Sequence, residues 1–86
     1  MKSITMMILP TCPYCVQAFD YMDQLKKEHP EYADIPMTII DESEEPEKAK
    51  QFHYWYVPTF FVDGEKIHEG VTDVKLIDEV FEKALA

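Results

Sequence analysis

Short apolar runs separated by polar turns are the clearest pattern in the chain, and two of them precede residue 42. The first, Lys2 to Leu9, is too continuously apolar for a surface strand and short enough for a buried one, which predicts a central β-strand. The second, Ile35 to Asp41, also predicts a buried strand, with Pro36 at its beginning, where a missing amide matters least.

A β-hairpin is predicted in the second half of the chain. Thr59 to Val62 is a third apolar run, and the Asp63-Gly64 pair that follows it is a strong turn signal. Glu65 to Glu69 alternates as a returning strand does, and Gly70 ends it.

Three stretches with helical patterning connect and follow these strands. Thr11 is a suitable N-cap for a helix that has Pro13 in its first turn and ends near Glu28 to Pro30. The apolar face predicted for this helix comprises Val16, Phe19, Met22 and Leu25. A short helix is expected to start in the acidic cluster around Ser43 and Pro46 and to run to about Gln51, and Thr72 can cap a last helix. The apolar face predicted for the last helix comprises Val74, Ile77, Val80, Phe81, Ala84 and Leu85.

The predicted order of elements is β-α-β-α-β-β-α, an α/β arrangement. Because helices connect the first three strands, the first two are expected to pair in parallel, and the hairpin then makes the sheet mixed. A chain of 86 residues has room for one hydrophobic core, so residues 1–86 are expected to form a single domain.

The only two cysteines lie in the tetrad Cys12-Pro13-Tyr14-Cys15, at the expected start of the first helix. Two thiols three positions apart at a helix start are what dithiol/disulfide exchange requires. The unpaired amides and the dipole of the helix start favour a thiolate at Cys12. Cys15 lies on the same helical face but closer to the core. We therefore expect Cys12 to attack a substrate disulfide and Cys15 to resolve the mixed disulfide that results.

Other roles for the cysteine pair stay open at this point. A structural zinc site would need about two more ligands, and the candidate ligands are single histidines without paired spacing: His29, His53 and His68. A permanent disulfide across so short a loop would stabilise the fold little. Two core cysteines can also lie at this spacing by chance.

The formal net charge is −9, with 17 acidic residues against 8 basic ones, all of them lysine. Nucleic acids and anionic membranes bind concentrated positive fields, so neither is expected as a partner. The acidic residues either form a solvated face or steer docking onto a basic patch of a protein partner. No apolar run approaches the roughly 18 residues of a membrane span, and no signal-peptide pattern is evident, so a cytoplasmic protein is expected. The chain is also expected to be a monomer.

In its motifs the sequence resembles the glutaredoxins of the thioredoxin superfamily. The resemblance covers essentially the whole chain and rests on the Cys-Pro-Tyr-Cys tetrad, on Val57-Pro58 at the third strand and on Gly70-Val71-Thr72-Asp73 before the last helix. It implies a thioredoxin fold, in which a four-stranded mixed β-sheet is flanked by three helices. It also implies that Cys12 is the exposed nucleophile and that Pro58 is cis and faces the cysteines.

The same resemblance implies a substrate site and an activity. The backbone of Val57, beside Pro58, would pair with an extended substrate such as glutathione. Thr72 and Asp73 would hold the γ-glutamyl end of glutathione, and Tyr14 would be exposed and shape access. The implied activity is that of a thiol-disulfide oxidoreductase acting on protein disulfides or glutathione mixed disulfides. Glutathione would be the reductant, with no bound cofactor or metal.

Three positions depart from the glutaredoxin pattern and keep other readings open. Leu9 stands where a basic residue is usual, Tyr56 where a threonine is usual, and Glu69 where a glycine is usual. The alternative is a thioredoxin-like electron donor, reduced by a flavoprotein thioredoxin reductase and serving an enzyme such as ribonucleotide reductase. A metal or [2Fe–2S] binding module is a further one. Trp55 and Tyr56 are interpreted as core residues, with an exposed docking surface as the alternative.

Overall fold

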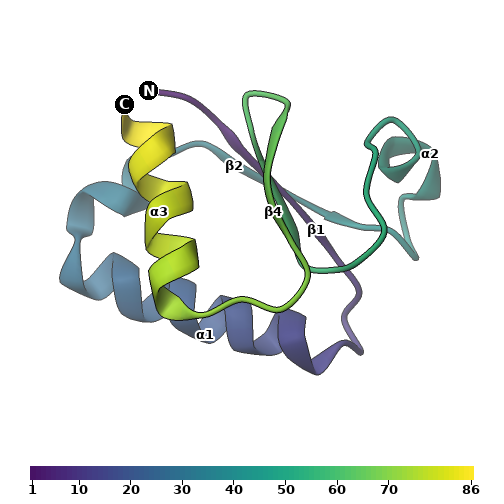
Figure 1. The fold of residues 1–86 in the computed structure, drawn as a ribbon, viewed down its shortest axis with the longest axis horizontal. Helices are drawn as coiled ribbons and strands as arrows, with labels where there is room; N and C mark the ends of the chain where they lie inside the picture. Colours follow the sequence, from purple (N-terminus) through teal and green to yellow (C-terminus); the bar gives the residue numbers. More distant parts are fainter.

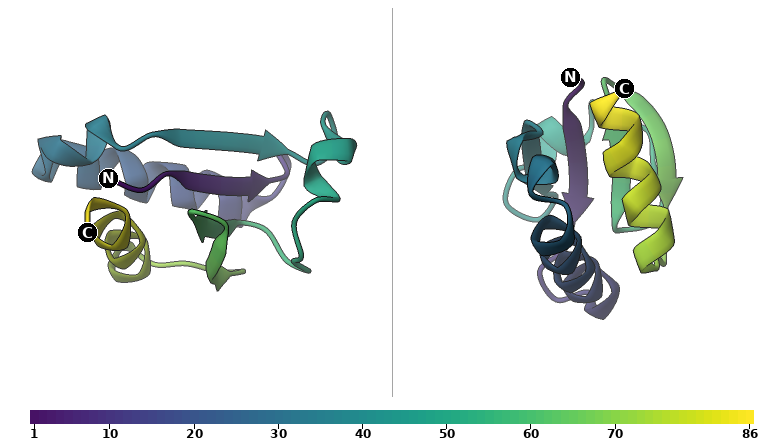
Figure 2. Two further views of the ribbon diagram at one scale, coloured as in Figure 1. Left: turned by 90° about the horizontal axis from the view of Figure 1, so that it is seen from above. Right: turned by 90° about the vertical axis from the view of Figure 1, so that its left-hand side faces the viewer.

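Four strands form one mixed sheet in the order β2-β1-β3-β4 in the computed structural model, which describes residues 1–86. β1 (Ile4–Ile8) pairs in parallel with β2 (Met37–Asp41), and the two arrows point the same way in Figure 2. β3 (Thr59–Val62) is antiparallel to β1, and β4 (Glu65–Glu69) is antiparallel to β3. The predicted central position of the first strand, the hairpin and the mixed sheet are therefore confirmed.

Two α-helices and one 3₁₀ turn lie between the strands, and a third α-helix follows the last strand (Figure 1). They are α1 (Pro13–Glu28), the 3₁₀ turn η1 (Pro30–Asp34), α2 (Pro46–Ala49) and α3 (Val74–Leu85). The predicted order is confirmed, and η1 is an addition to it. It begins at Pro30 because proline cannot continue the ladder of α1, and the preceding His29 leaves the helical conformation at φ −129°.

The two faces of the sheet carry separate hydrophobic clusters because successive side chains of a strand point to opposite sides. α1 and α3 pack together on one face, against a cluster that includes Ile4, Met6, Phe60 and Val62. α2 covers part of the other face, where Ala49 joins Met7, Ile40 and Phe61. Figure 1 shows α2 at the opposite end of the molecule from α3.

The last helix is held mainly by packing. Its buried side chains are Ile77, Val80, Phe81 and Ala84. Burying a large apolar side chain stabilises a fold by about 1.5–3 kcal/mol, more than any single helix cap contributes. The ring of Phe81 stacks on Tyr32 of η1, whose hydroxyl donates to Asp78 Oδ1 at 2.5 Å. The 3₁₀ turn is thereby fastened to α3.

Several predicted burial patterns are wrong. β2 is an edge strand and not a buried one, with Ile40 buried but Ile39 43% exposed, because only one neighbouring strand and a single short helix cover it. Val16 and Val74 are also exposed, since each lies in the first turn of its helix and points away from the sheet. The buried stripe of α1 is instead Cys15, Ala18, Met22 and Leu25, about one position round the helix from the predicted stripe.

No helix in the structure is both long enough and apolar enough to cross a membrane.

Candidate active site

The cysteine tetrad lies where β1 passes into α1. Cys12 is the N-cap residue of α1, with extended backbone angles of φ −81° and ψ 119°. Its carbonyl accepts hydrogen bonds from the backbone N–H groups of Cys15 (3.0 Å) and Val16 (3.2 Å). Pro13 then occupies the first helical position, where its missing N–H costs nothing and its fixed φ suits the helix.

The prediction that Thr11 caps this helix is therefore wrong by one residue. No side chain caps the first turn of α1, and no acidic residue lies in it. Pro13 has no N–H and the amides of Cys15 and Val16 donate to the Cys12 carbonyl, so the N–H of Tyr14 is the free donor of this turn. Such a start favours negative charge nearby, which is the condition that a thiolate needs.

The two thiols lie in different environments, although both are free in this structure. Cys12 is partly exposed, whereas Cys15 is 1% exposed and belongs to the main hydrophobic cluster. The pKa of Cys15 is raised to about 11, mainly by burial; the proximity of Cys12 adds to the rise, while a hydrogen bond from the Leu9 backbone acts in the opposite direction. At neutral pH Cys15 is therefore a protonated thiol, and its reactivity as a thiolate rises with pH.

The Val57-Pro58 peptide bond is cis and lies against Cys12, although 45 residues separate Cys12 from Val57. The thiol of Cys12 donates to the carbonyl oxygen of Val57 at 3.9 Å. The N–H of Val57 makes no hydrogen bond within the chain, so this residue, whose carbonyl contacts the thiol, keeps one free backbone donor. The predicted cis configuration is confirmed, and the pairing of Val57 with a substrate stays a prediction.

Residues 53–57, here called the aromatic loop, present two exposed rings before this proline. Trp55 is 79% exposed and Tyr56 is 69% exposed, so the interpretation of both as core residues is wrong. The physical reason is that Phe52 and Tyr54 supply the inward packing, against the cluster below β3. Val57 also packs against this cluster, and Trp55 and Tyr56, which lie between Tyr54 and Val57, are left exposed to solvent.

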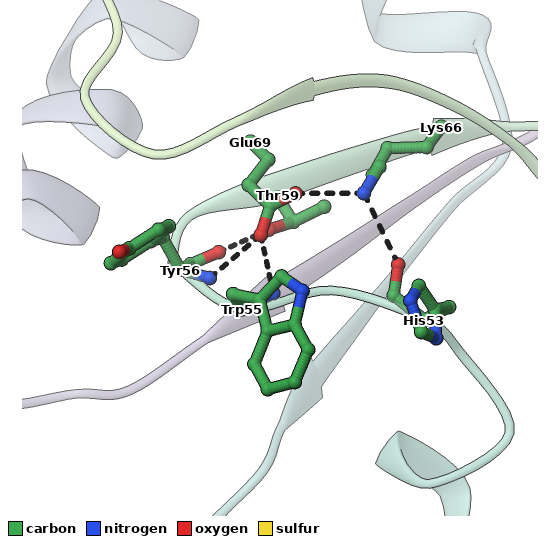
Figure 3. Close-up of polar contacts among 6 residues, drawn as sticks. All are labelled: His53, Trp55, Tyr56, Thr59, Lys66 and Glu69. Atoms are coloured by element: carbon green, nitrogen blue, oxygen red, sulfur yellow. Dashed lines mark hydrogen bonds and ion pairs between the residues drawn. The ribbon is translucent and has the colours of Figure 1, made fainter.

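Glu69, the last residue of β4, binds the backbone of the aromatic loop from the side (Figure 3). Its Oε2 accepts from the N–H groups of Trp55 and Tyr56, the latter at 2.9 Å, and its Oε1 pairs with Lys66 Nζ at 2.7 Å. Lys66 Nζ also donates to the carbonyl of His53 at 3.4 Å. Two side chains of one strand therefore fix three backbone groups of the loop.

The Glu69 carboxylate is strongly stabilised in its charged form. Lys66 and the two loop amides lower its pKa from 4.5 to about 2. Since the folded pKa is lowered, the stabilising effect is fully present above about pH 4.5 and is lost as the pH falls toward 2. In the sequence, Glu69 stands out only as a departure from the glutaredoxin pattern.

The remaining predicted site residues lie near the start of α3 and in the tetrad. Asp73, and not Thr72, is the N-cap of α3, because its Oδ1 accepts from the N–H of Leu76 at 2.8 Å. Thr72 is 8% exposed, and its hydroxyl oxygen has no hydrogen-bond partner. Their role toward glutathione stays a prediction. Tyr14 is 45% exposed, as expected for a residue between the two cysteines.

No group of three or more metal-ligating side chains comes together in the structure. Each histidine lies against a different neighbour. The Nδ1 of His29 is 3.8 Å from a Glu31 carboxylate oxygen, the His53 ring meets the Trp55 ring edge-on, and the His68 Nε2 is 2.8 Å from the Val71 carbonyl.

Comparison with known proteins gives consistent matches. Residues 2–82 match a family model described as "Thioredoxin domain". A protein named "Probable Thioredoxin" from Methanothermobacter thermautotrophicus is 36% identical over 55 residues, which are 64% of this chain and 62% of that protein. The match therefore spans less than two thirds of that relative's length. A second protein of the same name, from Methanothermobacter marburgensis, is 31% identical over an alignment of 74 residues, and the match covers 74% of this chain and 85% of that protein.

The fold is shared with a solved structure as well. The oxidised thioredoxin from Plasmodium falciparum superposes with a TM-score of 0.72 at 17% identity, over 99% of this chain and 82% of the other. The expected thioredoxin fold is therefore confirmed.

Proposed function

Since this chain belongs to the thioredoxin family, we propose that it is a thioredoxin-like thiol-disulfide oxidoreductase that reduces disulfides in polypeptides. The observation that carries the proposal is the asymmetry of its two thiols. Cys12 is partly exposed at the start of α1 against the Val57 carbonyl, and Cys15 is buried one helical turn behind it. An accessible attacking thiol with a protected second thiol is the arrangement that two-step exchange requires.

In the first step, the Cys12 thiolate attacks one sulfur of the substrate disulfide. The substrate S–S bond breaks, a Cys12–substrate disulfide forms, and the leaving sulfur takes up a proton. In the second step, Cys15 loses its proton and attacks the Cys12 sulfur, which releases the second substrate sulfur as a thiol. Two electrons pass to the substrate, and the chain is left with a Cys12–Cys15 disulfide.

The raised pKa of Cys15 sets the order of these steps. A thiol with a pKa of about 11 is almost entirely protonated at neutral pH and does not compete for the substrate. It attacks only when the mixed disulfide lies next to it, where intramolecular proximity replaces a high thiolate fraction.

Substrate recognition is proposed to use the backbone of Val57. Its carbonyl lies beside Cys12 and its N–H is free, so this backbone can pair with an extended polypeptide, as a sheet edge does with an added strand. The exposed rings of Trp55 and Tyr56 would supply apolar contact area on the same side of the loop.

We propose a flavoprotein thioredoxin reductase, and not glutathione, as the source of electrons. Glutathione carries two carboxylates, while this chain has no arginine, has Leu9 where glutaredoxins usually place a base, and has a net charge of −9. The matched family and the named relatives are thioredoxins, so the resemblance to glutaredoxins in particular is not supported. A reducing compartment such as the cytoplasm would suit this electron supply.

A coupled assay tests the proposal. Oxidised protein is offered NADPH with a panel of flavoprotein thioredoxin reductases, or glutathione with glutathione reductase, and NADPH consumption is followed with a polypeptide disulfide present. We expect at least one thioredoxin reductase to sustain a rate at least about ten times that of the glutathione system. A faster rate with glutathione would restore the glutaredoxin reading, and no turnover with either system would exclude disulfide reduction.

A further inference from the structure

We propose that Glu69 is a positioning residue for polypeptide disulfides: by holding the backbone of the aromatic loop, it places Val57 and the two exposed rings beside Cys12. This inference rests on the proposed function. It adds a residue outside the cysteine tetrad and the cis-proline bond, and it assigns that residue to one class of substrate.

Both oxygens of the Glu69 carboxylate are engaged. One oxygen, Oε2, accepts from two successive backbone amides, those of Trp55 and Tyr56. The other oxygen pairs with Lys66, which itself reaches the carbonyl of His53 (Figure 3). The Glu69 side chain is only 17% exposed, so these bonds are partly shielded from water.

The backbone of Tyr56 and Val57 links Glu69 to the Cys12 thiol. Tyr56 has both backbone groups engaged: its N–H with Glu69, and its carbonyl with the hydroxyl of Thr59 at the start of β3. The next residue is Val57, whose carbonyl meets the Cys12 thiol. Glu69 therefore sets the position of the Val57 backbone through Tyr56, the residue immediately before it.

An irregularity in β4 lets Glu69 and Lys66 reach the same loop. In a regular strand, positions 66 and 69 would point to opposite faces, because side chains alternate. The pairing of β3 with β4 shifts register between Phe60 and Phe61, so that Phe61 pairs with Lys66 but Phe60 with His68. This bulge brings the side chains of Lys66 and Glu69 to the same side, where they meet.

The consequence depends on the size of the substrate. A polypeptide that pairs with Val57 and covers the exposed rings needs the loop in one position, and holding it there in advance avoids an ordering cost on binding. A small disulfide that reaches only the Cys12 sulfur does not use the loop. Loss of Glu69 should therefore affect the two substrates differently.

The experiment compares Glu69→Ala, Glu69→Gln and the wild type, with Glu65→Gln as the matched control. Glu65 lies on the same strand, is exposed and makes no side-chain hydrogen bond. Two quantities are measured: kcat/KM for a polypeptide disulfide and for a small aromatic disulfide, and amide hydrogen exchange at Trp55 and Tyr56. Exchange is also read in the wild type alone, which keeps the test valid if a variant folds poorly.

We expect Glu69→Ala to lower kcat/KM for the polypeptide about tenfold or more, mainly through KM, since hydrogen bonds to a charged acceptor are lost. Glu69→Gln should lie between alanine and the wild type, because its amide oxygen still accepts a hydrogen bond. The small disulfide should react within about twofold of wild type in every variant. The Trp55 and Tyr56 amides should be protected in the wild type and in Glu65→Gln, and should exchange faster in both Glu69 variants.

Three results would overturn the inference. Equal losses for both substrates would show that Glu69 acts on the thiols or on the whole fold. Unprotected amides at Trp55 and Tyr56 in the wild type would remove the hydrogen bonds on which the inference rests. A wild type that reduces neither substrate would overturn the proposed function and, with it, the role of Glu69 in selecting substrates. The exchange data would still report separately whether Glu69 holds the loop.

Discussion

Replacing Cys12 with serine is expected to abolish disulfide reduction. The hydroxyl of serine is not ionised at neutral pH and cannot form a disulfide, so neither the first attack nor the mixed disulfide is possible. We expect the turnover of a polypeptide disulfide to fall by about three orders of magnitude or more, to the uncatalysed background. The measurement is NADPH-coupled turnover with a thioredoxin reductase.

Folding serves as the control for this variant. Cys12 is partly exposed and its hydrogen bond to Val57 is long, so the Cys12→Ser variant should unfold at nearly the same temperature as the wild type. Residual turnover within about tenfold of wild type in a folded Cys12→Ser protein would mean that Cys12 is not the attacking thiol.

Replacing Cys15 is expected to stop turnover while leaving the first attack intact. Cys12 still forms the mixed disulfide, but no second thiol is present to release the substrate. The mixed disulfide should therefore accumulate to one substrate per chain, visible by intact mass. Its rate of formation should stay within about threefold of wild type in a single-turnover experiment.

Two substitutions are needed at Cys15 because it lies in the core. Serine would bury a hydroxyl at a site that is 1% exposed, which costs about 1–3 kcal/mol if the hydroxyl finds no partner, whereas alanine leaves only a small cavity. Both variants should trap the substrate. If either folded variant fails to make the first attack, the roles of Cys12 and Cys15 are the reverse of those proposed.

Local and periodic signals predicted much of the fold and the position of the thiols. The apolar run before Leu9, the proline in the first helical turn and the Asp63-Gly64 turn each act over a few residues, and each appears where expected. The cysteine pair could be placed for the same reason, since its position depends on one strand and one helix. Helix caps differed by one residue, because Cys12 and Asp73 are each next to another residue that can cap.

Features that depend on distant pairing could not be predicted in the same way. Ile39 is exposed because β2 lies at the edge of the sheet, and strand order is set by contacts across the whole chain. Trp55 and Tyr56 are exposed because their neighbours fill the core, which composition alone does not reveal. The position of Glu69 depends on a bulge in β4 that the regular alternation of Glu65 to Glu69 conceals.

The most direct test of the central claim is the oxidation state of the two thiols during one turnover. Reduced protein is mixed with an equal amount of a polypeptide disulfide, free thiols are alkylated, and the masses of both proteins are read. We expect each chain that reacts to lose both thiols together, as an intramolecular disulfide, while the substrate gains two thiols. A thioredoxin reductase with NADPH should then restore the two thiols of the chain. A substrate left oxidised, or chains that lose one thiol each through intermolecular linkage, would contradict a Cys12–Cys15 dithiol mechanism.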